Sequence, residues 1–230
     1  MASQFFTRAR TIAAIGRNYA AHAKELGNAV PTSPFFFLKP PGCMVRNGEA
    51  VQVPQGVEAH FEVELGVIIG TKATNVSKAD ASKYIGGYAL AIDMTARNMQ
   101  DAAKKAGLPW SAAKGLDTFC PISDMIDVKD VKDHSNMKLW LKVNGETKQS
   151  GNTSDMTFDI PALLEHVTGI MTLEVGDVLL TGTPPGVGPV RPGDRMTAGI
   201  ANGDAKDGEH LAELDVPVVE RQGGFTFARL

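Results

Sequence analysis

Short apolar runs, separated by glycine- and proline-containing turns, extend along the whole chain and predict strands more often than helices. The run from His60 to Gly70 is rich in β-branched residues, and a second run extends from Tyr84 to Asp93. Alternation of apolar and polar residues predicts a strand from Met137 to Val143, and Asn144-Gly145 directly after it is typical of a hairpin turn. Further strands are expected at 11–16, at 35–38 as a buried strand, at 51–54, within 176–188, at 195–200 and at 211–219.

Helical spacing of apolar residues is confined to a few short segments. Helices are expected at 19–26, 77–83, 94–107 and 159–169. The first of these rests on the spacing of Tyr19, Ala23 and Leu26. Thr95 is a possible N-cap of the third, and Gly107 is suited to end it. Many strands and few helices predict a β-rich α+β protein.

Composition narrows the class of partner. The chain has 230 residues, a hydrophobic fraction of 43% and a net charge of −3, with no run of lysine or arginine. A nucleic-acid partner is therefore not expected. No apolar run approaches the roughly 18–20 residues that span a bilayer, so no membrane partner is expected either. Cys43 and Cys120 lack metal-ligand spacing and favour a reducing compartment.

The first residues differ in composition from the rest of the chain. Segment 1–10 carries two arginines, and no acidic residue precedes Glu25, which is compatible with a mitochondrial transit segment. We therefore expect an N-terminal extension at 1–10, a single domain at 11–230 and a mitochondrial location, with the cytoplasm as the alternative.

Three carboxylates lie in or next to the two long apolar runs. Glu62 and Glu64 are two residues apart, so both side chains should lie on one face of the expected strand, and Asp93 ends the following apolar run. Oxygen ligands of this kind suit Mg²⁺, Mn²⁺ or Ca²⁺ rather than zinc. The alternative is a solvated sheet face. We favour a metal site because a charge beside a buried run must be paired or bound to metal.

Other polar residues occur in patterns that suit the binding or proton transfer of a small anion. His22 and Glu25 are three residues apart on the first expected helix, where the carboxylate could orient the imidazole. Arg97 and Gln100 have the same spacing near the start of a later helix, where they could hold a substrate carboxylate. Both pairs could instead be ordinary exposed residues.

Two lysines and a threonine complete the set of candidates. Lys39 ends an expected strand and could reach an anionic substrate, or simply be a solvated turn residue. Lys114 lies in an otherwise uncharged stretch, where a desolvated ammonium could bind an anion or donate a proton, although most isolated lysines do neither. Thr183 lies in a Gly/Pro/Thr loop that could line a pocket.

Several blocks in the same order make the chain resemble the fumarylacetoacetate hydrolase family, over roughly Ile12 to Val219. These blocks are Gly16-Arg17-Asn18-Tyr19 with His22 and Glu25, Phe37-Leu38-Lys39-Pro40, Glu62-Val63-Glu64-Leu65-Gly66-Val67, the segment 86–100, Gly107-Leu108-Pro109-Trp110 with Lys114, and the segment 181–188. The chain is most similar to the short, single-domain branch of acylpyruvases and oxaloacetate decarboxylases. Larger members carry an additional N-terminal domain, so we expect a substrate other than fumarylacetoacetate.

The resemblance implies a rolled mixed β-sheet with a few flanking helices, and a homodimer. It also implies a role for each matched residue. The residues that match the family's ligands for Mg²⁺ or Mn²⁺ are Glu62, Glu64 and Asp93. Those that match its catalytic residues are His22, Glu25 and Lys114. Those that match its substrate contacts are Arg97, Gln100 and Thr183, with Arg17 and Lys39 matching more loosely.

The activity implied is cleavage of a carbon–carbon bond in a small 2-oxo acid, either by hydrolysis of a 3-acylpyruvate or by decarboxylation of oxaloacetate. Both routes pass through a pyruvate enolate that the metal stabilises. Keto–enol tautomerisation of oxaloacetate is the alternative, since it needs only the metal and a proton carrier. We favour cleavage because His22 and Glu25 are both present. A non-catalytic protein stabilised by metal is the remaining possibility.

Overall fold

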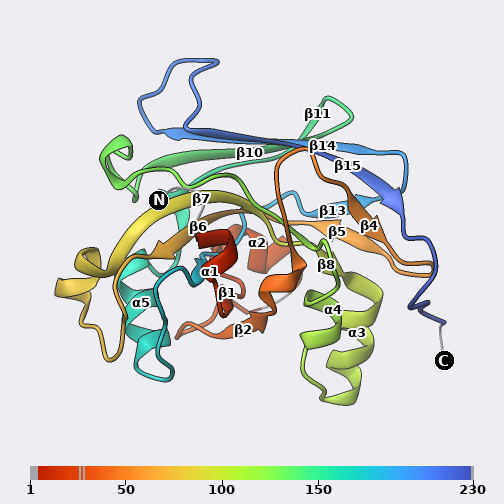
Figure 1. The fold of residues 1–230 in the computed structure, drawn as a ribbon, viewed down its shortest axis with the longest axis horizontal. Coiled ribbons are helices and arrows are strands. Elements are labelled where there is room, and N and C mark those ends of the chain that lie inside the picture. The colour runs from red at the N-terminus through yellow and green to blue at the C-terminus, as the bar shows by residue number, and fades with distance from the viewer. Residues whose placement is uncertain (1–4, 26, 28, 229–230) are drawn as a thin grey trace.

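In the computed structural model, residues 5–25, 27 and 29–228 are described, and β-sheets dominate the fold (Figure 1). The first sheet has the order β2 (Phe36–Lys39), β1 (Ile12–Ile15), β12 (Val178–Leu180), β6 (Val63–Ile69) and β7 (Ile85–Ile92). The second has the order β11 (Glu146–Asn152), β10 (Met137–Val143), β14 (Arg195–Asn202), β15 (Ala212–Glu220) and β4 (Val51–Val53). Smaller sheets join β13 (Gly188–Val190), β5 (Ala59–Phe61) and β8 (Thr95–Ala96), and β3 (Met44–Val45) with β9 (Cys120–Pro121).

Both large sheets mix parallel and antiparallel pairs. In the first sheet β1 and β12 are parallel, and all other neighbouring strands of that sheet are antiparallel to each other. In the second sheet β15 is parallel to β4, and the rest is antiparallel. The second sheet passes across β6 and β7, and β10 and β15 contact them (Figure 1). The predicted β-rich α+β fold with mixed sheets is confirmed.

Strand β1 shows why the apolar runs lack clear alternation. Successive side chains point to opposite faces of a strand. Ala13 and Ile15 join the main core between the sheets, whereas Ile12 and Ala14 join a second cluster that also contains Phe5. Because both faces of the strand are covered, every position in it is apolar.

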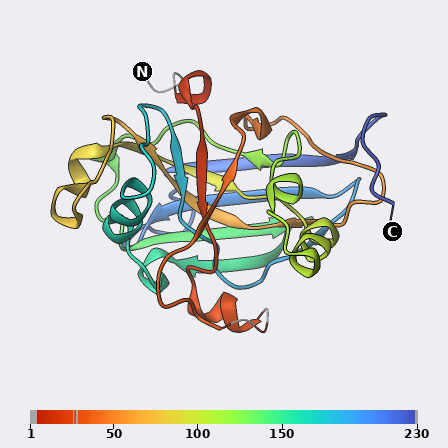
Figure 2. The same cartoon turned by 90° about the horizontal axis from the view of Figure 1, so that it is seen from below.

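Helices flank the sheets at their ends and edges. They are α1 (Phe5–Arg8), α2 (Ala20–Glu25), α3 (Arg97–Ala106), α4 (Ser111–Lys114) and α5 (Ile160–Thr168), with 3₁₀ turns η1 (Pro41–Cys43), η2 (Lys78–Tyr84), η3 (Val128–Asp130) and η4 (Thr153–Asp155). Figure 2 shows α5 and the α3–α4 pair at opposite ends of the sheets. Asp159 caps α5 as predicted, since its carboxylate accepts a hydrogen bond from the Ala162 amide at 2.8 Å. Among the helices of the described residues, none has the length and apolarity needed to cross a bilayer.

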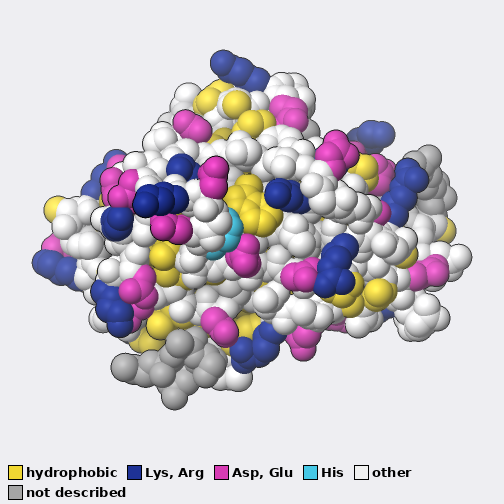
Figure 3. Space-filling model, turned by 90° about the horizontal axis from the view of Figure 1, so that it is seen from above, with side chains coloured by type: hydrophobic (Ala, Val, Ile, Leu, Met, Phe, Trp, Pro, Cys, Tyr) yellow, Lys and Arg dark blue, Asp and Glu magenta, His cyan; other side chains and the backbone are white. Residues whose placement is uncertain are grey.

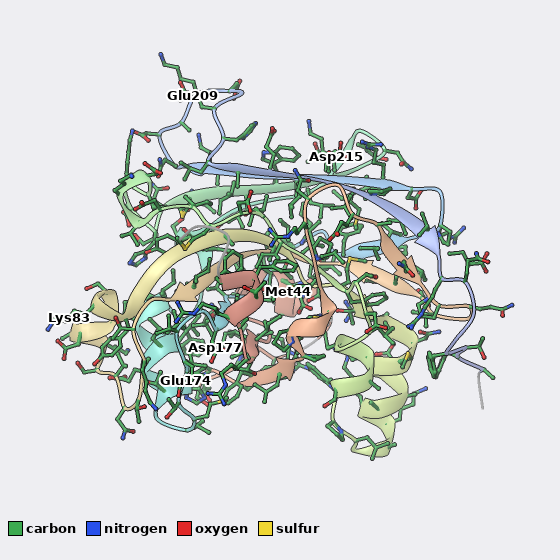
Figure 4. The ribbon with its side chains drawn as sticks, viewed as in Figure 1. Met44, Lys83, Glu174, Asp177, Glu209 and Asp215 are labelled. Carbon is green, nitrogen blue, oxygen red and sulfur yellow. The ribbon has the colours of Figure 1, made fainter. Side chains whose placement is uncertain are left out.

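The start of the chain is tied to the domain through Asp177. Its carboxylate accepts hydrogen bonds from the amides of Arg10 at 2.7 Å, Thr11 at 2.9 Å and Glu174 at 2.7 Å. Figure 4 shows Asp177 beside Glu174, on the same side of the molecule as α5. Phe5 is buried in the second cluster, so residues 5–10 pack against the rest of the fold.

The structure corrects the predicted strand at 60–70. The chain leaves the small sheet after β5 and enters the first sheet at β6, so Glu62 lies at a break between two strands. The predicted buried strand at 35–38 is also shifted and less covered. It becomes β2, which ends at the buried Lys39, and its Leu38 is 45% exposed because β2 is an edge strand.

Two helical predictions also change in detail. Thr95 does not cap α3, because it lies in β8 and its hydroxyl donates to Glu62 instead. The helix begins at Arg97 and ends at Gly107 as predicted. The segment predicted at 77–83 forms the 3₁₀ turn η2. Leu26, on which the first predicted helix partly rested, lies outside the described residues, and α2 ends at Glu25.

The outer face of the second sheet carries a mixed surface. Figure 3, viewed from above this sheet, shows Lys/Arg and Asp/Glu side chains interspersed around a small apolar area. Trp140 of β10 lies on the outer side of the sheet, and its ring contacts His210 with centroids 5.6 Å apart. Lys142 lies 5.1 Å from the centroid of the same ring. Charges of both signs thus surround the exposed aromatic contact.

Candidate active site

Three buried carboxylates converge where β6 and β7 run side by side. Glu62 lies just before β6, Glu64 lies within it, and Asp93 follows β7. The two strands are antiparallel, and the Asp93 amide donates to the Glu62 carbonyl at 2.7 Å, which brings their ends together. One oxygen of each carboxylate lies within 4.8 Å of the others. The predicted convergence is confirmed, although Glu62 lies at a break between two strands and not within one.

Cations and a hydroxyl surround Glu62. The Arg97 guanidinium donates to Glu62 Oε1 at 2.7 Å, and the Thr95 hydroxyl donates to the same oxygen at 2.8 Å. Lys114 donates to Glu62 Oε2 at 3.1 Å and to Asp93 Oδ2 at 2.6 Å. Burial opposes ionisation of Glu62, but Lys114, Arg97 and Thr95 outweigh it and hold the pKa of this carboxyl well below its usual range. Glu62 is therefore held as a carboxylate.

Glu64 has the opposite electrostatic environment. Burial raises the pKa of its carboxyl well above the usual range, and the nearby charges of Asp93 and Glu62 raise it further. Its Oε2 accepts a hydrogen bond from the Gly182 amide at 2.7 Å. Gly182 has a φ of 98°, and an added Cβ would lie 2.8 Å from Asn18 Cβ, so the close approach requires glycine here. A further positive charge beside Glu64 would stabilise its ionised form.

Lys39 supports Asp93 from within the protein. Its buried ammonium donates to Asp93 Oδ1 at 2.7 Å and to the carbonyls of Met94, Lys114 and Phe119. Burial lowers the pKa of Lys39, but the charge of Asp93 outweighs this and keeps it above its ordinary value. Lys39 is not one of the described residues that line the adjacent cavity. The structure therefore places Lys39 behind a metal-ligand candidate, outside the lining of the cavity.

A cavity of about 40 Å³ is lined by Glu62 and Glu64, whereas Asp93 is not among its described lining residues. Most of the residues that the sequence predicted as functional line it. These are Arg17, His22, Glu62, Glu64, Arg97, Gln100, Lys114 and Thr183. Gln100 accepts a hydrogen bond from Arg97 Nη1 at 2.6 Å, and Arg97 Nε is buried without a hydrogen-bond partner among the described residues. The site thus combines anionic ligands with donors that suit a small anion.

His22 and Glu25 form a pair at the edge of this cavity. Glu25 Oε2 lies 3.3 Å from His22 Nδ1, and His22 is buried while the Glu25 side chain is 39% exposed. Both Glu25 oxygens also accept from the Gly186 amide at 3.1 Å. The loop that contains Gly186 therefore fixes Glu25, and Glu25 can orient the imidazole.

Several residues around the site were not predicted from the sequence. The buried Gln149 accepts from the Val63 amide at 2.9 Å and donates to Thr183 Oγ1 at 2.8 Å, which links β11 to the carboxylate strand. Thr183 in turn donates to the Val63 carbonyl, so its hydroxyl is used in positioning the loop. No local pattern marks Gln149. Lys104 also lines the cavity, and its spacing of four residues from Gln100 was a signal available in the sequence.

The donor set fits a divalent cation. Three carboxylates are hard oxygen ligands of the type that Mg²⁺ and Mn²⁺ prefer. A divalent charge near Glu64 would also offset the repulsion from Glu62 and Asp93 that raises its pKa. Glu62, Glu64 and Asp93 are therefore the residues that would hold such an ion.

Comparisons with known proteins agree with this site. The family model "Fumarylacetoacetate (FAA) hydrolase C-terminal" matches residues 11–219. The chain is 53% identical over 201 residues to an oxaloacetate tautomerase of Arabidopsis thaliana, covering 87% of this chain and 90% of the relative. It is 49% identical over 204 residues to an oxaloacetate decarboxylase of Dictyostelium discoideum, covering 88% and 94%. Both relatives are named as mitochondrial, in agreement with the location expected from the N-terminal composition.

Comparison with solved structures points to the same family. The crystal structure of a yeast protein of the fumarylacetoacetate hydrolase family is similar with a TM-score of 0.87 and 35% identity, over 98% of this chain and 99% of the yeast chain. The match thus extends over nearly the whole chain. The chain belongs to the fumarylacetoacetate hydrolase family.

Proposed function

We propose that the protein acts on oxaloacetate by enolisation, and that keto–enol tautomerisation is the reaction its site supports best. The observation that carries this proposal is the position of Lys114. Its ammonium contacts both Glu62 and Asp93 and also lines the cavity, so a proton carrier lies beside the candidate metal ligands. Tautomerisation requires only charge stabilisation and a proton transfer at C3. The names of the relatives from Arabidopsis thaliana and Dictyostelium discoideum support oxaloacetate as the substrate.

A bound Mg²⁺ or Mn²⁺ would act as a Lewis acid on the 2-oxo acid head of the substrate. The side chains supply the other functions. Arg97 and Gln100 bind and orient the carboxylate at C1, with Arg97 Nε as an available donor. In the enol-to-keto direction the Lys114 ammonium donates a proton to C3, and His22, oriented by Glu25, accepts the proton of the enol oxygen. In enolisation the neutral Lys114 amine accepts the C3 proton and His22 returns a proton to the oxygen. Thr183 positions the wall of the cavity.

Cleavage of a carbon–carbon bond is the second candidate function. The observation that favours it is the anchored His22–Glu25 pair, because Glu25 is fixed by both His22 and the Gly186 amide. An oriented pair of this kind suits activation of water, which hydrolysis of a 3-acylpyruvate needs and tautomerisation does not. Decarboxylation of oxaloacetate would use the same enolate without that water.

The test is an NMR time course on oxaloacetate and on acetylpyruvate, with chelator-treated protein before and after addition of Mg²⁺. Accelerated keto–enol exchange that depends on Mg²⁺ supports the tautomerase. Pyruvate above the rate of a protein-free Mg²⁺ control supports cleavage. Lys114→Met should abolish either activity, whereas Lys105→Met, at an exposed position of α3, is the matched control. Absence of both activities would reject the proposal in favour of a metal-stabilised, non-catalytic protein.

We also propose that the protein is a homodimer, as its family resemblance implies. Analytical ultracentrifugation of the purified protein tests this, and a sedimenting species with the mass of one chain, 24.5 kDa, would contradict it.

A further inference from the structure

Helix α3 presents a row of polar side chains to the cavity. Arg97, Gln100 and Lys104 are three and then four residues apart, which places them on one face of a helix. All three line the cavity. Arg97 lies at the inner end, because it donates to Glu62. Lys104 is seven residues further along α3, which corresponds to about 10 Å along the helix axis at about 1.5 Å per residue.

Lys104 also borders an aromatic wall of the same cavity. Its ammonium lies 5.6 Å from the centroid of the Trp110 ring, and Trp110 contacts the Phe37 ring with centroids 5.6 Å apart. Trp110 and Phe37 both line the cavity. A cation held over an aromatic face has a restricted position. Lys104 is therefore placed at the outer part of the cavity, with an apolar surface next to it.

The other partner of Lys104 is easily displaced. Lys104 pairs with Asp101 at 3.3 Å, but the side chains are 36% and 54% exposed. An exposed pair three residues apart on a helix is weak, because water screens it. An anion that enters the cavity can therefore take the place of Asp101 beside the ammonium.

We propose that Lys104 binds the second carboxylate of a four-carbon 2-oxo diacid, the C4 carboxylate of oxaloacetate. This inference rests on the proposed function and extends it. The 2-oxo acid head is held at the inner end by the carboxylate site with Arg97 and Gln100, so the remote carboxylate extends toward Lys104. The flexible lysine side chain covers the remaining distance. Lys104 thereby selects a diacid over an acylpyruvate, whose uncharged acyl group would contact only the aromatic wall.

The same contact affects which reaction follows. In decarboxylation the C3–C4 bond breaks, its electron pair moves toward the C2 carbonyl oxygen, and C4 leaves as neutral carbon dioxide. In tautomerisation C3 loses a proton, the C2 oxygen gains one, and C4 keeps its charge. A cation bound at C4 stabilises the substrate more than the transition state of decarboxylation, because the negative charge leaves C4. Lys104 therefore favours tautomerisation over loss of carbon dioxide.

The experiment compares Lys104→Met and Lys104→Arg with the wild type and with Lys105→Met. Lys105 is an exposed lysine of the same helix, so its substitution makes the same change of net charge. Keto–enol exchange of oxaloacetate and of acetylpyruvate is measured with Mg²⁺ present, together with the pyruvate formed from oxaloacetate. We expect Lys104→Met to lower kcat/KM for oxaloacetate about tenfold more than for acetylpyruvate, as loss of a hydrogen bond between charged groups predicts. We also expect Lys104→Met to form more pyruvate per keto–enol exchange event. In Lys104→Arg, both the preference for oxaloacetate in kcat/KM and the low yield of pyruvate should recover.

A binding measurement makes the test independent of turnover. Calorimetric titration of the Mg²⁺-loaded protein with malate and with lactate compares two hydroxy acids that differ by the second carboxylate. Lys104→Met should reduce the preference for malate about tenfold, and Lys105→Met should not change it. Equal losses for both acids, or no loss, would overturn the role of Lys104. If the wild type fails to convert oxaloacetate, the proposed function is rejected, and the malate–lactate comparison still decides whether Lys104 binds the second carboxylate.

Discussion

The Lys39 ammonium lies 2.7 Å from Asp93 Oδ1, and both side chains are buried. Lys114 contacts the other oxygen of the same carboxylate at 2.6 Å. Asp93 is thus held from two sides, and the inner cation is satisfied by backbone carbonyls as well. This arrangement fixes the orientation of a candidate metal ligand.

Lys39→Met should therefore destabilise the fold strongly. Removal of one partner of a buried ion pair costs about 3–5 kcal/mol of unfolding free energy. We expect the lower end of this range, because Lys114 still pairs with the other Asp93 oxygen. Urea unfolding in the presence of chelator measures the change. Lys83→Met is the control, since Lys83 forms an exposed pair with Asp80 and its loss should leave the unfolding free energy nearly unchanged. A similarly small effect at Lys39 would contradict the structural role assigned to this pair.

Glu64→Gln should separate metal binding from folding. Glutamine keeps the size of the side chain and can still accept from the Gly182 amide, but it removes the charge that a divalent ion needs. We expect the wild type to gain thermal stability when Mg²⁺ is added after chelation, because binding to the native state alone stabilises it. In Glu64→Gln this gain should disappear while the Tm in chelator is retained. Differential scanning fluorimetry with and without Mg²⁺ gives both values, and an unchanged gain in the variant would remove Glu64 from the ligand set.

The pH dependence of metal-free stability provides a separate test of Glu64. Its pKa is raised in the folded state, so the native protein holds a proton that the unfolded chain has lost above pH of about 4.3. Stability contributed by this group is present below that pH and decreases as pH rises toward the folded pKa, by at most about 1.4 kcal/mol per pH unit. In chelator, the wild type should therefore lose more stability than Glu64→Gln between pH 5 and 7. Parallel curves for the two proteins would show that Glu64 is ionised in the metal-free fold.

Glu25→Ala should abolish acylpyruvate hydrolysis without loss of metal binding. Glu25 contacts His22 and the Gly186 amide, and it is not among the converging carboxylates. Loss of a general base lowers the rate by about 10²–10⁴-fold. The variant is assayed for pyruvate release from acetylpyruvate and, in parallel, for stabilisation by Mg²⁺. Full hydrolytic turnover would reject Glu25 as part of the base.

Local sequence patterns were enough to predict most secondary structure. The Asn144-Gly145 dipeptide predicted the hairpin between β10 and β11, and both residues have positive φ there. Asp159 and Gly107 predicted a helix start and a helix end that the structure confirms. These features depend on a few neighbouring residues, whose backbone preferences and hydrogen bonds are decided within the segment itself.

The sequence by itself also determined the family and the three carboxylates, because their positions relative to apolar runs are visible along the chain. Only the tertiary structure decided which partners surround them. It broke the predicted strand at Glu62, turned Lys39 inward to Asp93, and brought Lys104 from the far end of α3 to the same cavity. Each of these outcomes joins segments that are distant in sequence, and their contacts are selected by the packing of two sheets and the need to pair buried charges, which no local pattern encodes.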